Sequence, residues 1–122
     1  SKLNNADLSE SNLAGLSLSG LDLRVADLSG SVLANADLSK ANLGGAKLKD
    51  ADLRNASLKD AILRGCDLRN ADLSNTDCSG ADFTGADLRG AVFTNAETSA
   101  ALNLINAKNA HKAKDLKLNY SE

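Results

Sequence analysis

The chain has 122 residues and a net charge of −2, and 43% of its residues are hydrophobic, although it contains only one Tyr, two Phe and no Trp. This length suits one domain, whose core must be built from small and aliphatic side chains. No run approaches the ~18 apolar residues of a membrane span, and the mild charge does not by itself indicate a partner. Because Met is absent, we expect a processed or trimmed chain, which leaves the compartment open between the cytoplasm and a thylakoid lumen or periplasm.

Residues 1–100 form an unbroken repeat of five residues, as in residues 51–73, which read ADLRN, ASLKD, AILRG, CDLRN and ADL. The centres of the repeats lie at residue numbers ending in 3 or 8, and 16 of these 20 positions are Leu. The position two residues before the centre is Ala 13 times, and the position two residues after it holds eight Gly, six Asn and two Asp. Each repeat therefore offers one large apolar residue, one small residue and one residue that tolerates a turn.

This period fits neither an α-helix nor a flat sheet. Inward positions drift around a helix of 3.6 residues per turn, and centres five residues apart change face at every step along a flat strand. A chain that bends once in every five residues must instead wind into a coil, whose turns stack at the spacing of β-strands. The two remaining positions of each repeat are mostly polar, so we expect them to face water.

The segments ADLSK, ANLGG, ADLRN and ADFTG resemble the pentapeptide-repeat proteins, whose pattern is A-(D/N)-L-x-x. The resemblance covers residues 1–100 and implies an all-β solenoid, a right-handed quadrilateral β-helix with four repeats per coil. The 20 repeats would then form about five coils, a stack roughly 24 Å tall. The family is abundant in cyanobacteria and occurs in thylakoid lumens, so the resemblance makes a photosynthetic source plausible.

In such a coil the centres form ladders that make up the structural core. We expect Phe83 and Phe93 to fill a wider last coil. Cys66 and Cys78 fall on opposite sides of the fourth coil, so two buried thiols are favoured over a disulfide or a metal pair. One of these ladders consists of Leu8, Leu28, Leu48, Leu68 and Leu88.

The two ends of the predicted coil differ. The pattern stops after Thr98, and the apolar spacing of the following residues predicts a capping α-helix from about residue 100 to residue 114. The whole capping segment comprises residues 101–122. After the helix, an extended tail would pack back against the coil through Leu116, Leu118 and Tyr120. The first coil has no such cover, which allows three interpretations: a head-to-head homodimer through this coil, a lost upstream segment, or a frayed coil.

The position before each centre is rich in acidic residues, which offer a possible interaction surface. Some pentapeptide-repeat proteins are acidic dimeric rods that imitate DNA and bind type II topoisomerases. Basic residues such as Lys47 interleave with the acids here, which favours a lattice of weak surface ion pairs. The acidic residues that we expect to contribute to such a surface are Asp27, Asp67, Asp72 and Asp87.

No pattern in the sequence indicates catalysis, a cofactor or a metal. Phosphate-binding loops and nucleophile elbows are absent, and the single histidine, His111, has no partner group at a catalytic spacing. The basic tail lacks the stacking aromatics of a nucleic-acid site. We therefore predict a non-enzymatic structural or protein-interaction module with an unknown protein partner, no cofactor, and no nucleic-acid or membrane partner. Inhibition of a topoisomerase such as gyrase by DNA mimicry is the alternative.

Overall fold

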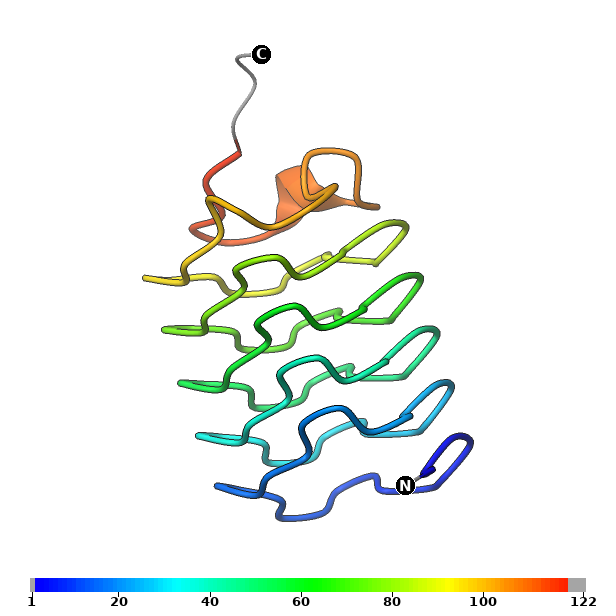
Figure 1. Ribbon diagram of the computed structural model, residues 1–122. Helices are drawn as coiled ribbons and strands as arrows, with labels where there is room; N and C mark the ends of the chain where they lie inside the picture. Colours follow the sequence, from blue (N-terminus) through cyan, green and yellow to red (C-terminus); the bar gives the residue numbers. More distant parts are fainter. Residues whose placement is uncertain (1, 119–122) are drawn as a thin grey trace.

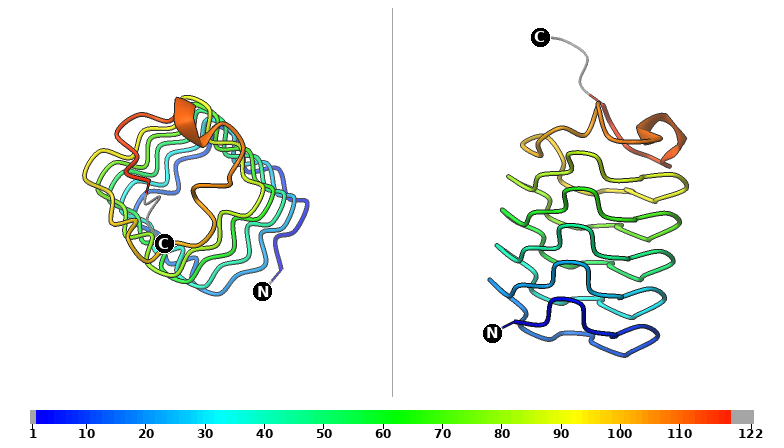
Figure 2. Two further views of the ribbon diagram at one scale, coloured as in Figure 1. Left: turned by 90° about the horizontal axis from the view of Figure 1, so that it is seen from above. Right: turned by 90° about the vertical axis from the view of Figure 1, so that its right-hand side faces the viewer.

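The computed structural model describes residues 2–118, which wind into a square coil rising from the N-terminal to the C-terminal end (Figure 1). Seen along its axis, the coil is a stack of overlying four-sided turns (Figure 2). Parallel bridges join residues 20 positions apart, as in Asp7 with Asp27 and Asp27 with Lys47. One turn therefore takes four five-residue repeats, and each repeat forms one side.

The four sides are defined by the residue before each centre, which forms the bridge to the next turn. Each side takes one such residue from every turn, at intervals of 20 positions. Side one holds Lys2, Asp22, Asn42, Ile62 and Asp82; side two holds Asp7, Asp27, Lys47, Asp67 and Asp87; side three holds Asn12, Val32, Asp52, Asp72 and Val92; side four holds Ser17, Asp37, Ser57, Asp77 and Glu97.

The corners of the square are left-handed residues. Every fifth residue from Asn5 to Asn95 has a positive φ, between 54° and 73°. Gly, Asn and Asp occupy most of these positions because they adopt this conformation at little cost. Glu10, Val25 and Lys40 adopt it too, although their side chains disfavour it. The turn is thus imposed by the coil as a whole, even where the local residue opposes it.

Between residues 26 and 80, a repeat in which an Asp or Asn precedes the centre leaves none of its five backbone N–H groups without a partner. Three of the five groups bond to a neighbouring turn, one closes the corner, and one bonds to the Asp or Asn side chain. This complete pairing explains why the coil is stable without long strands. In the repeat of residues 26–30 the bonds are Ala26 N to Leu23 O (3.1 Å), Asp27 N to Ala6 O (2.9 Å), Leu28 N to Lys47 O (2.7 Å), Ser29 N to Asp27 Oδ1 (3.0 Å) and Gly30 N to Lys49 O (2.9 Å).

The interior is filled by the centres and the small residues. From Leu23 to Phe93, every centre is at most 2% exposed. Leu8 is only half-buried, because the first turn has a neighbour on one side alone. Phe83 and Phe93 meet edge to face in the last turn, with ring centroids 6.2 Å apart. The remaining members of the ladder of Leu8, which are fully enclosed, are Leu28, Leu48, Leu68 and Leu88.

Cys66 and Cys78 are free thiols, as predicted, and both are buried. Burial raises the pKa of the Cys66 thiol well above its usual value and that of Cys78 to about 11. Thr76 Oγ1 lies 3.2 Å from Cys78 Sγ, so this thiol also has a polar neighbour. Both cysteines act as small core residues and are not poised as nucleophiles.

The predicted capping α-helix is wrong. The segment of residues 100–114 contains only one short 3₁₀ helix, η1 (Ala110–Lys112), and otherwise continues the winding of the coil (Figure 1). Leu102, Lys108 and Lys114 bridge to the last full turn on sides one, two and three. Within the described residues, no helix is long and apolar enough to cross a membrane.

The segment that covers the last turn has a six-residue period. Asn103, Asn109 and Asp115 each directly follow a bridge residue and have a left-handed backbone, with φ between 58° and 63°. Each bridge to the last turn still forms across this longer period; Leu102 N bonds to Ala81 O at 2.7 Å. Leu104 is buried by this layer, and Leu116 and Leu118 pack against the core half-buried, whereas Tyr120 lies outside the described residues.

Candidate interaction surface

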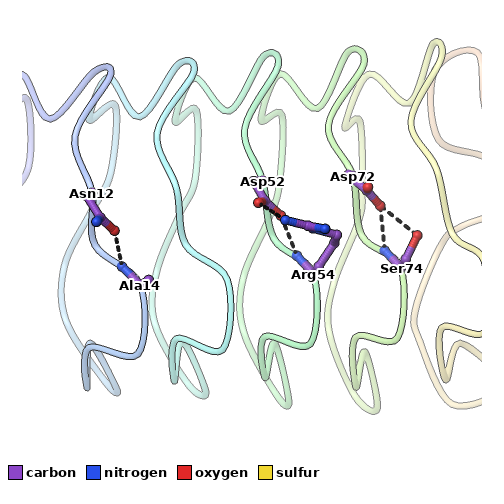
Figure 3. A network of polar contacts seen from close by, with 6 residues as sticks. All are labelled: Asn12, Ala14, Asp52, Arg54, Asp72 and Ser74. Carbon is purple, nitrogen blue, oxygen red and sulfur yellow. Dashed lines mark hydrogen bonds and ion pairs between the residues drawn. The ribbon is translucent and has the colours of Figure 1, made fainter.

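The Asp and Asn side chains at the position before each centre, here called the acidic column, first of all cap the turns of the backbone. A side-chain oxygen of the Asp or Asn accepts the backbone N–H two residues later, which no other backbone group satisfies. Figure 3 shows three of these caps on side three, at Asn12, Asp52 and Asp72. The residues that make this bond are Asp7, Asn12, Asp22, Asp27, Asp37, Asn42, Asp52, Asp67, Asp72, Asp77, Asp82 and Asp87.

Many of these carboxylates bind a second group from the same repeat. Where Ser follows two residues later, its hydroxyl donates as well, as Ser74 Oγ does to Asp72 Oδ1 at 2.6 Å. At Arg24, Arg54 and Arg69 the guanidinium donates two bonds to the Asp two residues earlier, as Arg54 does to Asp52 in Figure 3. A two-pronged pair of this kind has the geometry that Arg and carboxylate favour. The carboxylates are therefore largely committed within their own repeats.

Three of the four acidic residues proposed from the sequence share side two. Asp27, Asp67 and Asp87 stand in one column there, and Asp72 belongs to side three. The N–H and hydroxyl of Ser29 hold the pKa of Asp27 below its usual value, and Arg69 does the same for Asp67, with Nη2 to Oδ2 at 2.7 Å. The structure thus splits the proposed set between two neighbouring sides.

Asp87 is held by the capping segment. Its partial desolvation raises its pKa, but the hydrogen bonds from Asn109 and from the Arg89 backbone outweigh this, and the pKa is lowered. Asn109 Nδ2 lies 3.0 Å from Asp87 Oδ1, and Arg89 bonds through its backbone N at 3.2 Å. The capping layer therefore reaches onto side two and changes its outer surface.

Side two is acidic at its N-terminal end and mixed with basic groups beyond it. Asp7 and Asp27 are followed by Lys47, and the positions after the centres change from Ser9 and Ser29 to a run of cations. Within the described residues, the amine of Lys49 and the guanidinium of Arg89 form no ion pair at contact distance. The basic residues of this part of side two are Lys47, Lys49, Arg69, Arg89 and Lys108.

Sequence reasoning missed the local role of the acidic column. The signal was present in the repeats ADLS and ADLR, in which a donor follows each Asp by two residues. Asn103, Asn109 and Asp115 were also missed as residues with a left-handed backbone, because their six-residue spacing differs from the period of the coil. Asn103 Nδ2 donates to Thr84 Oγ1 at 2.6 Å and Thr94 Oγ1 donates to Asp115 Oδ2 at 2.6 Å, which ties the cap to the last turn.

The cap covers three sides of the last turn and leaves a hollow over the fourth. This hollow has a volume of about 520 Å³. Its wall combines Leu104, Ile105 and Leu118 with the charged residues Glu97 and Lys117. Among the described residues, no group of three or more His, Cys, Asp or Glu is arranged to hold a metal ion. The hollow follows from the shape of the cap and has no set of reactive groups.

Comparison with known proteins agrees with this geometry. The family model for pentapeptide repeats matches the chain in eight copies, over residues 1–30, 26–65, 51–90 and 71–97. The chain therefore belongs to the pentapeptide-repeat family, and its square coil is the right-handed quadrilateral β-helix of that family. A search of curated protein sequences gave no significant match.

Several solved structures share the fold. HetL, a pentapeptide-repeat protein involved in heterocyst differentiation regulation in the cyanobacterium Nostoc sp. PCC 7120, has a TM-score of 0.83 and 34% identity over 87% of this chain and 50% of its own. A pentapeptide-repeat protein from the Arabidopsis thaliana thylakoid lumen has a TM-score of 0.56 and 32% identity, over 76% of this chain and 65% of its own. QnrB1, a plasmid-mediated fluoroquinolone resistance protein, has a TM-score of 0.61 and 27% identity, over 70% of this chain and 46% of its own. The chain thus spans half the length of HetL.

Proposed function

We propose that the protein is a non-enzymatic module that binds another protein through the outside of its coil. The observation that carries this proposal is the filled interior, in which the centres from Leu23 to Phe93 are at most 2% exposed. A substrate has no room inside the coil, so any specific contact is made on its sides or ends. The same proposal divides the chain into the repeat coil of residues 1–100 and a capping segment of residues 101–122.

Side two is the surface proposed for this contact. It is flat because one short residue pattern recurs in every turn, and it presents fixed charges at the spacing of β-strands. Its cations Lys49 and Arg89 have no ion pair of their own among the described residues. They can therefore meet acidic groups of a partner without first giving up a bond. Such a contact gains specificity and association rate from complementary charge.

A charge-reversal experiment tests this surface. The double variant Lys49→Glu/Arg89→Glu is compared with Lys40→Glu/Lys59→Glu, which makes the same change in charge at two exposed positions, Lys59 on side four and Lys40 at the corner that ends this side. Each protein is immobilised and exposed to an extract of the source organism, after circular dichroism has verified the fold. We expect the wild type and the side-four variant to retain a common protein that the side-two variant loses. Equal retention by both variants, or none by the wild type, would contradict the proposal.

Inhibition of a type II topoisomerase by DNA mimicry is the second candidate. The similarity to QnrB1 supports it, since that protein is a fluoroquinolone resistance protein of the same fold. The local bonding of the carboxylates argues against it, because Arg24, Arg54 and Arg69 neutralise acids that a DNA mimic would display. A gyrase supercoiling assay separates the two candidates: loss of supercoiling at micromolar protein would favour the mimic, and unchanged supercoiling favours the interaction module.

A further inference from the structure

Four cations of side two stand in one column, from the third turn up to the cap. Lys49, Arg69 and Arg89 follow each other at intervals of 20 residues, and Lys112 takes the next place. The backbone C=O of each one accepts the N–H of the corner residue in the preceding turn, at 2.9, 3.0, 2.9 and 3.1 Å in this order. The column therefore rises by about 4.8 Å per cation, the spacing of paired strands.

The side chains of this column have donors available for a partner. Among the described residues, Lys49, Arg89 and Lys112 form no ion pair, and Arg69 pairs only with Asp67. That pair uses Nε and one N–H of Nη2, at 2.8 and 2.7 Å, so the guanidinium keeps three of its five N–H groups. Each of the four cations can therefore bind a carboxylate from outside the chain.

The surroundings of the column are positive as well. The nearest acids are already bound, Asp67 by Arg69 and Asp87 by Asn109 Nδ2 at 3.0 Å. This part of side two carries six cations, the four of the column with Lys47 and Lys108, against three acids, Asp50, Asp67 and Asp87. An anionic partner is thus favoured over a cationic one.

The spacing of the column selects the structure of such a partner. Its four cations span about 14 Å, which is three steps of the strand spacing. On an α-helix, acids at i, i+3, i+7 and i+10 line one face and span about 15 Å. Four side chains on one face of an extended strand span about 20 Å, so the mismatch grows to about 6 Å at the last cation. Helical spacing fits the column, and strand spacing does not.

We propose that side two binds an α-helix of a partner protein, which lies along the axis of the coil and turns one row of Asp or Glu toward the four cations. The proposal rests on the proposed function as a protein-interaction module and adds the class of partner. Exposed charge pairs of this kind set register and association rate more than they add affinity, so the contact is a weak and salt-sensitive one.

Three labelled peptides test the proposal by fluorescence anisotropy with the whole 122-residue chain. The first is an Ala-rich helix with four Glu in one row, at steps of three, four and three residues. The second has the same composition, but its Glu are five residues apart and spread around the helix. The third is the first with two central Ala replaced by Pro, which breaks the helix. We expect the first peptide to bind at least about fivefold more tightly than either of the others.

Two protein variants locate the contact, at an ionic strength of about 0.1 M, where charges more than about 10 Å apart are screened. Lys49→Glu/Arg89→Glu should weaken binding of the first peptide by about tenfold or more, and Lys40→Glu/Lys59→Glu should change it by less than about twofold. If circular dichroism shows that the first variant does not fold, Lys49→Gln/Arg89→Gln replaces it, with an expected loss of about threefold or more.

Three results would overturn the proposal: no binding of the first peptide, equal binding of all three peptides, or equal losses in the two protein variants. Tighter binding of an oligothymidylate than of the first peptide would also overturn it, because the column would then act as a nucleic-acid site. The extract assay above distinguishes this failure from failure of the proposed function. A partner captured by the wild type and lost by the side-two variant keeps the proposed function, even where the peptides show no preference.

Discussion

The corner residues decide the shape of the molecule one residue at a time. Each must adopt a left-handed conformation, and most corners use Gly, Asn or Asp, which do so readily. Among the corners that are not Gly, Asn or Asp, Val25 has the most strained backbone, because its β-branched side chain is held at a φ of 61°. Its side chain is 53% exposed, so it contributes little burial in return. The rest of the coil must stabilise this conformation.

Replacing Val25 with Gly should therefore stabilise the protein. Relief of the strained backbone should raise the free energy of unfolding by about 1 kcal/mol, less a few tenths for the greater freedom of Gly in the unfolded chain. Val32→Gly is the control, since Val32 is also exposed but lies on a side instead of a corner; it should destabilise. Urea denaturation of both variants measures the difference. A loss of stability in Val25→Gly would show that the corner is not strained.

At the scale of the structural elements, the repeat could be predicted from the sequence and the cap could not. The five-residue period has one solution, because leucines at this spacing share an interior only when the chain turns once per repeat. The capping segment has two solutions, since the separation of Ala101, Leu104 and Ala107 suits a helix as well as a six-residue winding. The edge of the last turn decides between them: Phe83 N and Ala81 O bond to Leu102, and a helix would leave them unpaired.

The candidate surface was predicted only in part, because its arrangement also depends on how the chain winds. The acidic column could be seen in the sequence, but its assignment to sides depends on the number of repeats per turn, which came from the family resemblance. The local bonds of the carboxylates depend on corner geometry that a one-residue pattern does not display. The spacing of Asp67 and Arg69 was visible in the sequence and suggested an ion pair, but their two-pronged geometry follows from a turn that brings residues two apart onto the same outer surface.

The capping layer should contribute measurably through Leu104. This side chain is 6% exposed and covers the last turn, so Leu104→Ala should lower the free energy of unfolding by about 2–3 kcal/mol. Its neighbour Ile105 is 39% exposed, and Ile105→Ala should cost less than about 1 kcal/mol. Thermal denaturation of the two variants compares them directly. Equal effects would mean that the six-residue layer does not seal the coil.

For the molecule as a whole, the carboxylate caps predict an acid-labile fold. Hydrogen bonds from the following Ser, Thr, Arg and Asn groups lower the pKa of nine aspartates below 3.8, to about 2 for Asp22. The folded state then binds fewer protons than the unfolded state, so this stabilisation is complete above about pH 5 and is lost as the pH falls toward 2. Urea denaturation across this range should show the decline. Constant stability from neutral pH down to about pH 2.5 would contradict it.

The buried thiols predict that stability falls as the pH rises in the alkaline range, opposite to the trend in acid. The pKa of Cys78 rises from 9.0 to about 11 on burial, so the folded state holds its proton while the unfolded state releases it. Stability should therefore be constant below about pH 8 and decline as the pH rises toward 11. Cys66→Ala places the usual small residue in its column and should reduce this decline without changing the acid limb. An unchanged alkaline profile would show that the Cys66 thiol does not contribute to it.

The central claim is that one turn of the coil takes 20 residues and that this register holds the leucines inside. Duplication of residues 41–60 adds one complete turn, whereas the same duplication without the second copy of Asn55 adds 19 residues and shifts every later bridge. Thermal unfolding followed by circular dichroism tests both proteins most directly. The account predicts that the 20-residue insertion unfolds cooperatively, at or above the wild-type Tm, and that the 19-residue insertion loses this transition or lowers it strongly. Two insertions that unfold alike would contradict the register, and with it the fold described for this chain.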